Sequence, residues 1–337
     1  MSATRLDPEA VRRTLRDAGL RARHALSQNF LADIDVLDAI LAEADPRPGA
    51  RVLEIGPGLG LLTAGLLDAG ANVTAVELDR GLAAFLRDRF AEPIDAGRLR
   101  LVEGDALDQD LAHLVASPFE VVANLPYHIT SPILHRLLGE TPRPDRLVLM
   151  VQREVAERIA APPGGMSYLS VFVQYHAKVR IAFDVPPEAF EPEPAVRSAV
   201  IVVEPYPADD RLPTAEAEDA LWRLVQASFR ERRKMLHNVL SRQLPVEPAT
   251  VTAALEIAGI APDRRPQTVA VGEWLKLLEA FGDIGPDRRG RRRGEAASAA
   301  NEATDANEAA DANEAADADG AADADGAADA DATEPDA

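Results

Sequence analysis

The stretch RVLEIGPGLGLLTAGLLDAGANVTAVELD, residues 51–79, decides the fold. It reads as an apolar strand, a glycine-rich turn, a helix and a second apolar strand. The segments RLRLVEGDAL, FEVVANLPY and PDRLVLMVQREVAERI continue the alternation, each with an apolar strand pattern and with helical runs around it. Alternating strands and helices are typical of a parallel, doubly wound α/β sheet. The pattern therefore predicts such a sheet within residues 25–205.

Two further apolar segments are expected to close this sheet. They are YLSVFVQYHAKVRIAFDV, residues 168–185, and SAVIVVEP, residues 198–205. Both are rich in the β-branched and aromatic residues that favour strands. We therefore predict strands throughout both segments.

The rest of the chain differs from the sheet region in composition. Residues 1–24 have the pattern of a short helical lead-in, and EPYPADDRLPT is a proline- and aspartate-rich linker. Residues 214–284 show helical periodicity without a strand pattern, which predicts a small all-helical domain. Residues 285–337 hold a basic run and then an acidic, alanine-rich repeat with nothing to bury, so we expect this tail to be disordered.

The composition excludes several kinds of protein. The chain of 337 residues has no cysteine, which rules out disulfides, thiolate nucleophiles and cysteine-ligated zinc. The six histidines show no metal-ligand spacing, and the DADG pieces of the tail lack the later ligands of a calcium loop. No run approaches the 18 apolar residues of a membrane span. We therefore expect a cytoplasmic protein without a metal or a membrane partner.

The charge is divided unevenly along the chain. The net charge is −20, but residues 295–337 carry 14 acidic residues and no Lys or Arg, so residues 1–294 have a net charge of only −6. Basic residues cluster at 230–234, on a predicted helix, and at 288–293. Either cluster fits RNA phosphates or a solvated charged surface. The acidic tail either shields the second cluster or is simply solvated.

Polar and glycine residues follow four successive predicted strands. Gly56 and Gly58 come directly after the first strand, Glu77 ends the second, Asp105 follows the third and Asn124 ends the fourth. The carboxyl ends of parallel strands meet at one edge of a sheet, where such folds bind ligands. The glycine turn alone also fits a nicotinamide-type nucleotide. Glu77 is placed to accept hydrogen bonds from ribose hydroxyls.

The whole pattern resembles that of Rossmann-like S-adenosylmethionine-dependent methyltransferases. The turn NLPY, residues 124–127, is similar to that of adenine-N6 methyltransferases. The exocyclic amine of adenine is a poor nucleophile because its lone pair is delocalised into the ring. The Asn124 side-chain carbonyl and the Leu125 backbone carbonyl would accept hydrogen bonds from the two N–H groups of this amine. Tyr127 would stack on a base turned out of its helix.

Two further segments resemble the rRNA adenine dimethyltransferase family. HALSQNFL, residues 24–31, has Ser27 where the family usually has glycine, and VPPEAFEPEPAVRSAVI, residues 185–201, has Ala195 where it usually has lysine. Segments of the helical domain also match, so the resemblance covers about residues 20–282. It implies that Asn29 and Leu31 contact the methionine end of the cofactor. It also implies that Phe190 stacks on the flipped adenine opposite Tyr127.

The resemblance implies a function as well as a fold. Gly56, Gly58 and Glu77 would hold the amino-acid and ribose parts of S-adenosylmethionine, Asp105 its adenine, and Asn124 would border both cofactor and base. The sequence NLPYHIT at residues 124–130 favours the branch of this family that dimethylates two adjacent adenosines near the 3′ end of 16S rRNA. The expected partner is the immature small ribosomal subunit, bound by a monomer through its helical C-terminal domain.

Three alternatives remain open from the sequence. Erm-type resistance enzymes share the cofactor site but act on 23S rRNA. A noncatalytic RNA-binding assembly factor would keep the fold, although a pure binder would not need both the glycine turn and the intact turn at 124–127. A DNA adenine methyltransferase fits less well, because the all-helical domain and Leu125 after Asn124 count against it.

Overall fold

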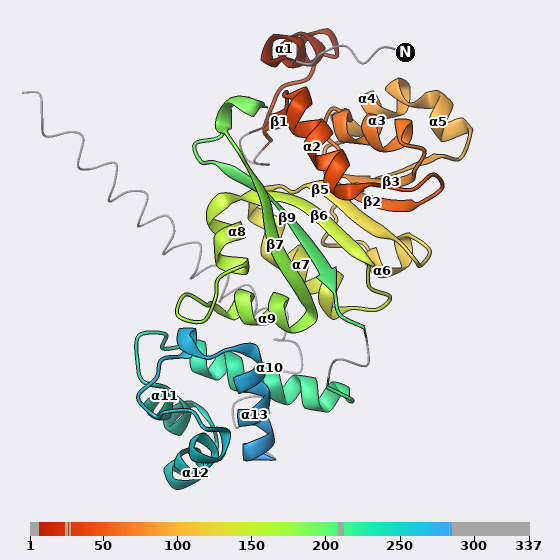
Figure 1. The fold of residues 1–337 in the computed structure, drawn as a ribbon. Helices are drawn as coiled ribbons and strands as arrows, with labels where there is room; N and C mark the ends of the chain where they lie inside the picture. The colour runs from red at the N-terminus through yellow and green to blue at the C-terminus, as the bar shows by residue number, and fades with distance from the viewer. Residues whose placement is uncertain (1–6, 24–25, 27, 208–211, 283, 285–337) are drawn as a thin grey trace, which may run out of the picture. The chain divides into compact units, whose positions relative to one another are not determined.

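The computed structural model describes residues 7–23, 26, 28–207, 212–282 and 284. The chain divides into two compact units, residues 1–285 and residues 286–337. The second unit, with the basic run at 288–293 and the acidic tail, lies outside the described residues. Figure 1 shows the fold of the first unit.

A seven-stranded sheet forms the centre of the first unit, in the order β4-β3-β2-β5-β6-β9-β7. The five strands from β4 to β6 are parallel, whereas β9 runs antiparallel to both β6 and β7. This arrangement confirms the predicted Rossmann-like fold. The strands are β2 (Arg51–Ile55), β3 (Asn72–Glu77), β4 (Leu99–Glu103), β5 (Glu120–Asn124), β6 (Arg146–Gln152), β7 (Ala177–Val185) and β9 (Ser198–Pro205).

Helices cover both faces of this sheet, because successive side chains of a strand point to opposite faces. Leu53 and Ile55 of β2 pack with the helices α6 to α9, whereas Val52 packs with α2, α3 and α4 on the other face. The helices are α1 (Pro8–Asp17), α2 (Ile34–Ala44), α3 (Leu61–Asp68), α4 (Arg80–Arg89), α5 (Ala91–Asp95), α6 (Leu111–Leu114), α7 (Thr130–Gly139), α8 (Arg153–Ile159) and α9 (Tyr168–His176), with 3-10 turns η2 (Tyr127–Ile129) and η3 (Pro187–Ala189).

One of the predicted closing strands is wrong in its first half. Tyr168–His176 forms the helix α9, and only Ala177–Val185 forms the strand β7. Eight of the nine residues of α9 are buried, so the sequence lacks the polar side of an amphipathic helix, and an apolar run of this kind has no distinguishing period. The helix begins at a capping box in which Ser167 and Ser170 bond each other's backbone N–H.

A second, very short sheet lies beside the main one. Its two strands, β1 (Phe30–Leu31) and β8 (Phe190–Glu191), pair antiparallel with Leu31 opposite Phe190. We call this pair the β1–β8 ribbon. The helix α1 packs against it through Val11 and Leu15, which share an apolar cluster with Phe30. The ribbon joins a segment from the start of the chain to one that follows β7.

Four helices follow the sheet and enclose a core around the fully buried Trp274. They are α10 (Ala215–Phe229), α11 (Leu236–Gln243), α12 (Pro248–Ala258) and α13 (Val271–Phe281), with the 3-10 turn η5 (Pro266–Thr268). Trp222 of α10 packs on Phe172 of α9, with 5.1 Å between ring centroids. Within the part of the chain that the structure describes, no helix is both long and apolar enough to cross a membrane.

The predicted helix through the basic residues 230–234 is also wrong. The helix α10 ends at Phe229, and residues 230–234 form a turn before α11. Arg and Lys are good helix formers, but intrinsic propensity is a weak guide that tertiary contacts override. The backbone N–H of Leu236 bonds the carbonyl oxygen of Arg264 at 2.7 Å, which holds the turn against the loop before η5.

Candidate active site

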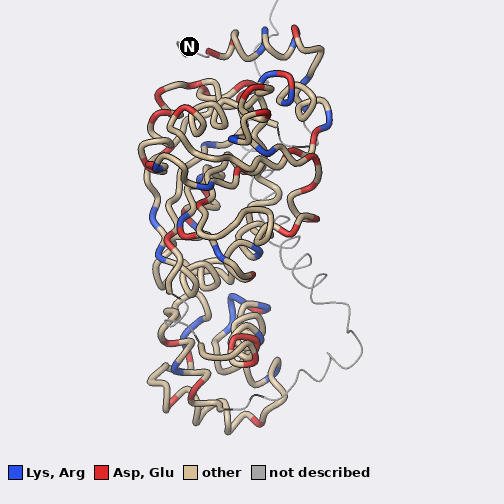
Figure 2. The backbone as a smooth tube through the Cα atoms, turned by 90° about the vertical axis from the view of Figure 1, so that its right-hand side faces the viewer, with Lys and Arg blue, Asp and Glu red and all other residues tan. Residues whose placement is uncertain are grey.

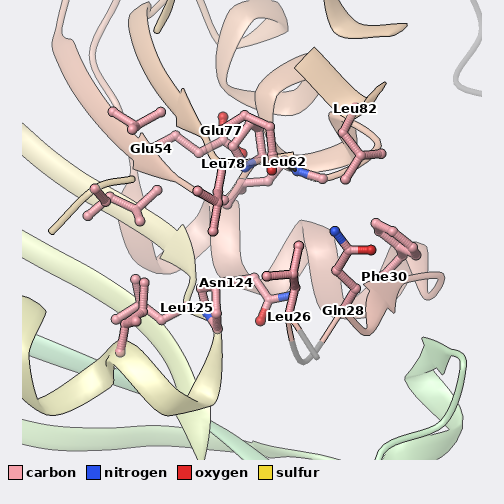
Figure 3. A pocket seen from close by; sticks show the side chains of 18 of the residues that line it. Leu26, Gln28, Phe30, Glu54, Leu62, Glu77, Leu78, Leu82, Asn124 and Leu125 are labelled. Carbon is pink, nitrogen blue, oxygen red and sulfur yellow. Dashed lines mark hydrogen bonds between the residues drawn. The ribbon is translucent and has the colours of Figure 1, made fainter. Parts of the chain in front are cut away.

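A pocket lies at the carboxyl ends of β2, β3, β4 and β5, and the segment before α2 forms another wall. In Figure 3, Glu77 and Leu78 lie on one side of it and Asn124 and Leu125 on the other, with Gln28 beside them. The pocket brings together nine residues that the sequence singled out: Asn29, Leu31, Gly56, Gly58, Glu77, Asp105, Asn124, Leu125 and Tyr127. Phe190 is not among its lining residues.

The glycine turn needs the backbone freedom that glycine alone has. Gly56, Gly58 and Gly60 have φ angles of +69°, +59° and +77°. Other residues rarely adopt this left-handed conformation. A Cβ added to Gly60 would lie 2.5 Å from the ring of Phe90, and one added to Gly58 would lie 3.1 Å from the ring of Phe30. The turn therefore leaves backbone rather than side chains facing the pocket, and it fits a ligand that comes close to the main chain.

Glu77 is held by the main chain on both carboxylate oxygens. Its Oε1 accepts the backbone N–H of Asp79 at 2.8 Å, and its Oε2 accepts that of Gly58 at 3.1 Å. Burial raises the pKa of Glu77 above its ordinary value, while these two hydrogen bonds act in the opposite direction. Each oxygen has a second lone pair, so the fixed carboxylate can accept the two hydroxyls of a ribose.

A second carboxyl group, Glu54, lies beneath the turn. It is 1% exposed, and the hydroxyl of Thr63 donates to its Oε2 at 2.7 Å. Burial raises the pKa of Glu54 to about 8, against an ordinary value of 4.5. Glu54 lines the pocket as well. Burial therefore favours the protonated form of this pocket carboxyl group.

The amide of Asn124 is oriented by the segment opposite it. Its Nδ2 donates to the backbone carbonyl oxygen of Asn29 at 3.4 Å, a long hydrogen bond. Because a carbonyl oxygen only accepts, this contact puts the NH₂ group towards Asn29 and leaves Oδ1 as the acceptor for a ligand. The next peptide is fixed too, since the Leu125 N–H donates to the Met150 carbonyl oxygen at 3.1 Å.

Tyr127 lies one residue beyond the stiff Pro126. Its hydroxyl is 2.7 Å from Oγ of Ser198, which is fully buried on β9. Burial raises the pKa of Tyr127, so the phenol is neutral at physiological pH. The hydrogen bond at the far end of the ring fixes the position of the hydroxyl and so anchors the Tyr127 side chain at the pocket.

Phe190 is placed differently from the other predicted residues. Its side chain is 1% exposed and packs in the apolar cluster that also contains Leu31, its partner in the β1–β8 ribbon. The structure therefore puts Phe190 next to a pocket residue but not in the pocket. Its stacking on adenine stays a prediction.

The sequence profile of the ribosomal RNA adenine dimethylase family matches residues 19–283. The chain belongs to this family. A curated relative, ribosomal RNA small subunit methyltransferase A of Anaeromyxobacter sp. (strain K), is 43% identical over 277 residues, which are 78% of this chain and 94% of the relative. The protein of the same name from Pseudomonas putida is 39% identical over 272 residues, covering 78% and 96% of the two chains.

Two solved structures support the same assignment. A dimethyladenosine transferase from Plasmodium falciparum is 28% identical with a TM-score of 0.65, over 77% of this chain and 99% of that one. The 23S rRNA methyltransferase ErmE is 29% identical with a TM-score of 0.61, over 76% and 100% of the two chains. The resemblance that the motifs indicated is confirmed, and the chain is a methyltransferase with the fold of this family.

Gln28 and Asp79, two polar residues at or behind this adenine dimethylase site, were not singled out from the sequence, and Glu54 and His128 line the pocket as well. Gln28 lines the pocket, where its Oε1 accepts the backbone N–H of Arg23 at 2.8 Å and its Nε2 lies 3.5 Å from Oδ2 of Asp79. Asp79 caps α4 and forms an ion pair with Arg23 at 3.1 Å. Both lie inside motifs quoted above, two residues or fewer from a predicted site residue. Asp105 lines the pocket, and its Oδ1 accepts the Leu107 N–H at 2.8 Å.

Proposed function

We propose that this adenine dimethylase uses S-adenosylmethionine to convert two adjacent adenosines near the 3′ end of 16S rRNA to N6,N6-dimethyladenosine. The observation that carries the proposal is the single pocket that joins Gly56, Gly58 and Glu77 to the turn at 124–127. The small-subunit name of the 39–43% identical relatives favours this substrate over the 23S rRNA named for the 29% identical structure.

The residues of the pocket fit this cofactor. The glycine turn would accommodate its amino-acid end against the backbone, the Glu77 carboxylate would accept hydrogen bonds from the ribose hydroxyls, and Asp105 would contact the adenine. Asn29 and Leu31 close over the methionine end. The cofactor would supply the methyl group as an electrophile, with its S–C bond breaking and S-adenosylhomocysteine leaving, and the residues named here would hold and orient it.

The turn at 124–127 fits the target amine. Oδ1 of Asn124 and the Leu125 carbonyl oxygen would accept hydrogen bonds from the two N–H groups of adenine N6. This arrangement would direct the nitrogen lone pair towards the methyl group. After the first transfer one N–H remains, so one acceptor is enough for the second. Directly after transfer the methylated N6 carries a positive charge and is strongly acidic, so it loses its proton to water. Tyr127 would stack on one face of the ring, and the Phe190 side chain, which is buried in this structure, would turn out of its apolar cluster to stack on the other.

We further propose that residues 25–205 carry the catalytic site and residues 214–284 the RNA contacts. Acidic and basic residues are interspersed along the described backbone (Figure 2), so phosphate binding depends on local clusters. The α10–α11 turn provides one, since Arg230, Arg232, Arg233 and Lys234 are all exposed there. We place the reaction in the cytoplasm, by a monomer acting on the immature small subunit.

A methyl-transfer assay tests the proposal. Undermethylated small subunits, large subunits and duplex DNA are offered with labelled S-adenosylmethionine, and the modified base is identified by mass spectrometry. We expect N6,N6-dimethyladenosine in the small subunit alone. Label in the large subunit would assign the chain to the resistance-type enzymes, and binding without transfer would make it an assembly factor. Label in DNA would contradict an RNA substrate.

A further inference from the structure

The β1–β8 ribbon connects the two halves of the site. Asn29 and Leu31 line the cofactor pocket, and the Asn29 carbonyl oxygen accepts from Asn124. On the other strand, Phe190 is the residue assigned to the target base. The pairing is direct, because Leu31 lies opposite Phe190 and the Ala32 N–H donates to the Ala189 carbonyl oxygen at 2.8 Å.

Such a ribbon cannot be stable by itself. Each strand has only two residues, and even a full two-stranded hairpin is marginal in water. Its position must therefore come from what packs on it. The cofactor-side strand has its own anchors, since Gln28 is bonded to Arg23 and Asp79 and since the Phe30 ring packs beside Gly58.

The base-side strand is anchored by α1. Nη2 of Arg12 lies 2.7 Å from Oε2 of Glu191, the residue directly after Phe190. The Arg12 side chain is 57% exposed and that of Glu191 is 16% exposed. The ion pair raises the pKa of Arg12 through its hydrogen bond with Glu191. The other side of α1 is fixed by Val11 and Leu15, which are buried against Phe30 and Leu82.

We propose that α1 is a clamp on the β1–β8 ribbon and that Arg12 is a positioning residue for methyl transfer. Through Glu191 it fixes the strand that carries Phe190 against the segment 29–31, which contacts the cofactor and Asn124. Arg12 does not line the pocket. The inference rests on the proposed function, because it assigns Phe190 to the target base.

Arg12→Ala should slow single-turnover methyl transfer at saturating cofactor by roughly three- to fivefold, the range expected for a partly exposed ion pair. The cofactor Kd and the melting temperature should change little, because Glu77, the glycine turn and Gln28 are untouched. Arg13→Ala is the matched control, since Arg13 is exposed on the same helix and outside the ribbon contact. It should behave like the wild type.

A charge swap separates positioning from a general loss of folding. The double variant Arg12→Glu with Glu191→Arg should recover at least half of the rate lost in Arg12→Glu alone, and Arg12→Lys should lose less than Arg12→Ala. Equal rates for Arg12→Ala, Arg13→Ala and the wild type would overturn the inference. So would a loss that follows the melting temperature or the cofactor Kd. A wild-type protein without transfer to adenine would instead contradict the proposed function.

Discussion

The two halves of the candidate site are built in different ways. The cofactor half consists mainly of the ends of adjacent parallel strands, where Gly56, Glu77, Asp105 and Asn124 each end a strand or follow one within two residues. The target-base half consists of the turn at 124–127, the 3-10 helix η2 and the strand β8, which pairs with the cofactor-side strand β1 from the opposite end of the catalytic region. The first half is fixed by local sequence and one sheet, and the second by contacts over long sequence separations. Substitutions should therefore affect binding in one half and transfer in the other.

Asn124→Ala should have the largest effect. Removal of an acceptor oriented at the reacting amine should lower the transfer rate by roughly 10²–10³-fold, while the cofactor Kd stays nearly unchanged. Single-turnover transfer and calorimetric binding of S-adenosylmethionine measure the two. Asn72→Ala, at the start of β3 and away from the pocket, is the control. Equal losses in both measurements would mean that Asn124 belongs to the cofactor half.

Glu77→Gln should affect the opposite half. The amide would lose one charge-assisted acceptor and place an NH₂ group against a backbone N–H donor, so the cofactor Kd should rise roughly 10- to 100-fold. The rate at saturating cofactor should fall much less. Glu103→Gln is a matched control, because Glu103 is paired with Glu77 in the sheet register but does not line the pocket. An unchanged cofactor Kd for Glu77→Gln would mean that Glu77 does not bind the ribose.

Phe190→Leu tests whether the buried ring serves the target base. Leucine keeps most of the apolar volume in a position where alanine would cost roughly 3–5 kcal/mol of folding stability. Loss of stacking should slow transfer by about tenfold without weakening cofactor binding. The rate of methyl transfer to small subunits and the thermal unfolding of the variant are each compared with those of the wild type. A wild-type rate of methyl transfer in Phe190→Leu would mean that Phe190 serves only the apolar core and not the target base.

The basic turn should influence RNA affinity alone. Arg232→Ala combined with Arg233→Ala should weaken binding to small-subunit RNA and lower the magnitude of the slope of log K against log salt by roughly one to one and a half units. Filter binding at several salt concentrations gives the slope. Arg98→Ala is the control, because Arg98 lies partly exposed beside β4 and is paired with Glu92. A slope equal to that of the wild type would show that this turn does not contact phosphates.

Glu54 should produce the smallest effect, a dependence of stability on pH. Its folded pKa of about 8 lies above the ordinary value of 4.5, so the folded state binds more protons between these values. The contribution of Glu54 to the free energy of unfolding is fully present below pH 4.5 and is lost as the pH rises through 8. The free energy of unfolding falls by at most about 1.4 kcal/mol per pH unit over this window. Denaturation of Glu54→Gln should therefore show a flatter profile over this window than the wild type. Glu154→Gln, an exposed carboxylate, should keep the wild-type profile, and identical profiles for all three would mean that Glu54 is ionised.

The contrast between the halves also explains what the sequence could predict. Gly56, Glu77, Asp105 and Asn124 each follow a strand with a clear apolar pattern, so their convergence needed only the rule for parallel sheets. The helix α9 was mistaken for a strand because it is buried on nearly all sides. The turn at 230–234 was mistaken for a helix because its end depends on Arg264, far along the chain. Phe190 could be assigned by resemblance, but no local pattern shows that its ring packs beside Leu31.

The separation between Arg12 and Glu191, 179 residues along the chain, has a consequence for biosynthesis. All the predicted cofactor residues lie before residue 130, whereas Phe190 and Glu191 leave the ribosome about 60 residues later, after roughly 3 to 12 s of translation. During that interval α1 has no base-side strand to hold. A growing chain thus has every part of its cofactor pocket before it can complete the site that would act on RNA.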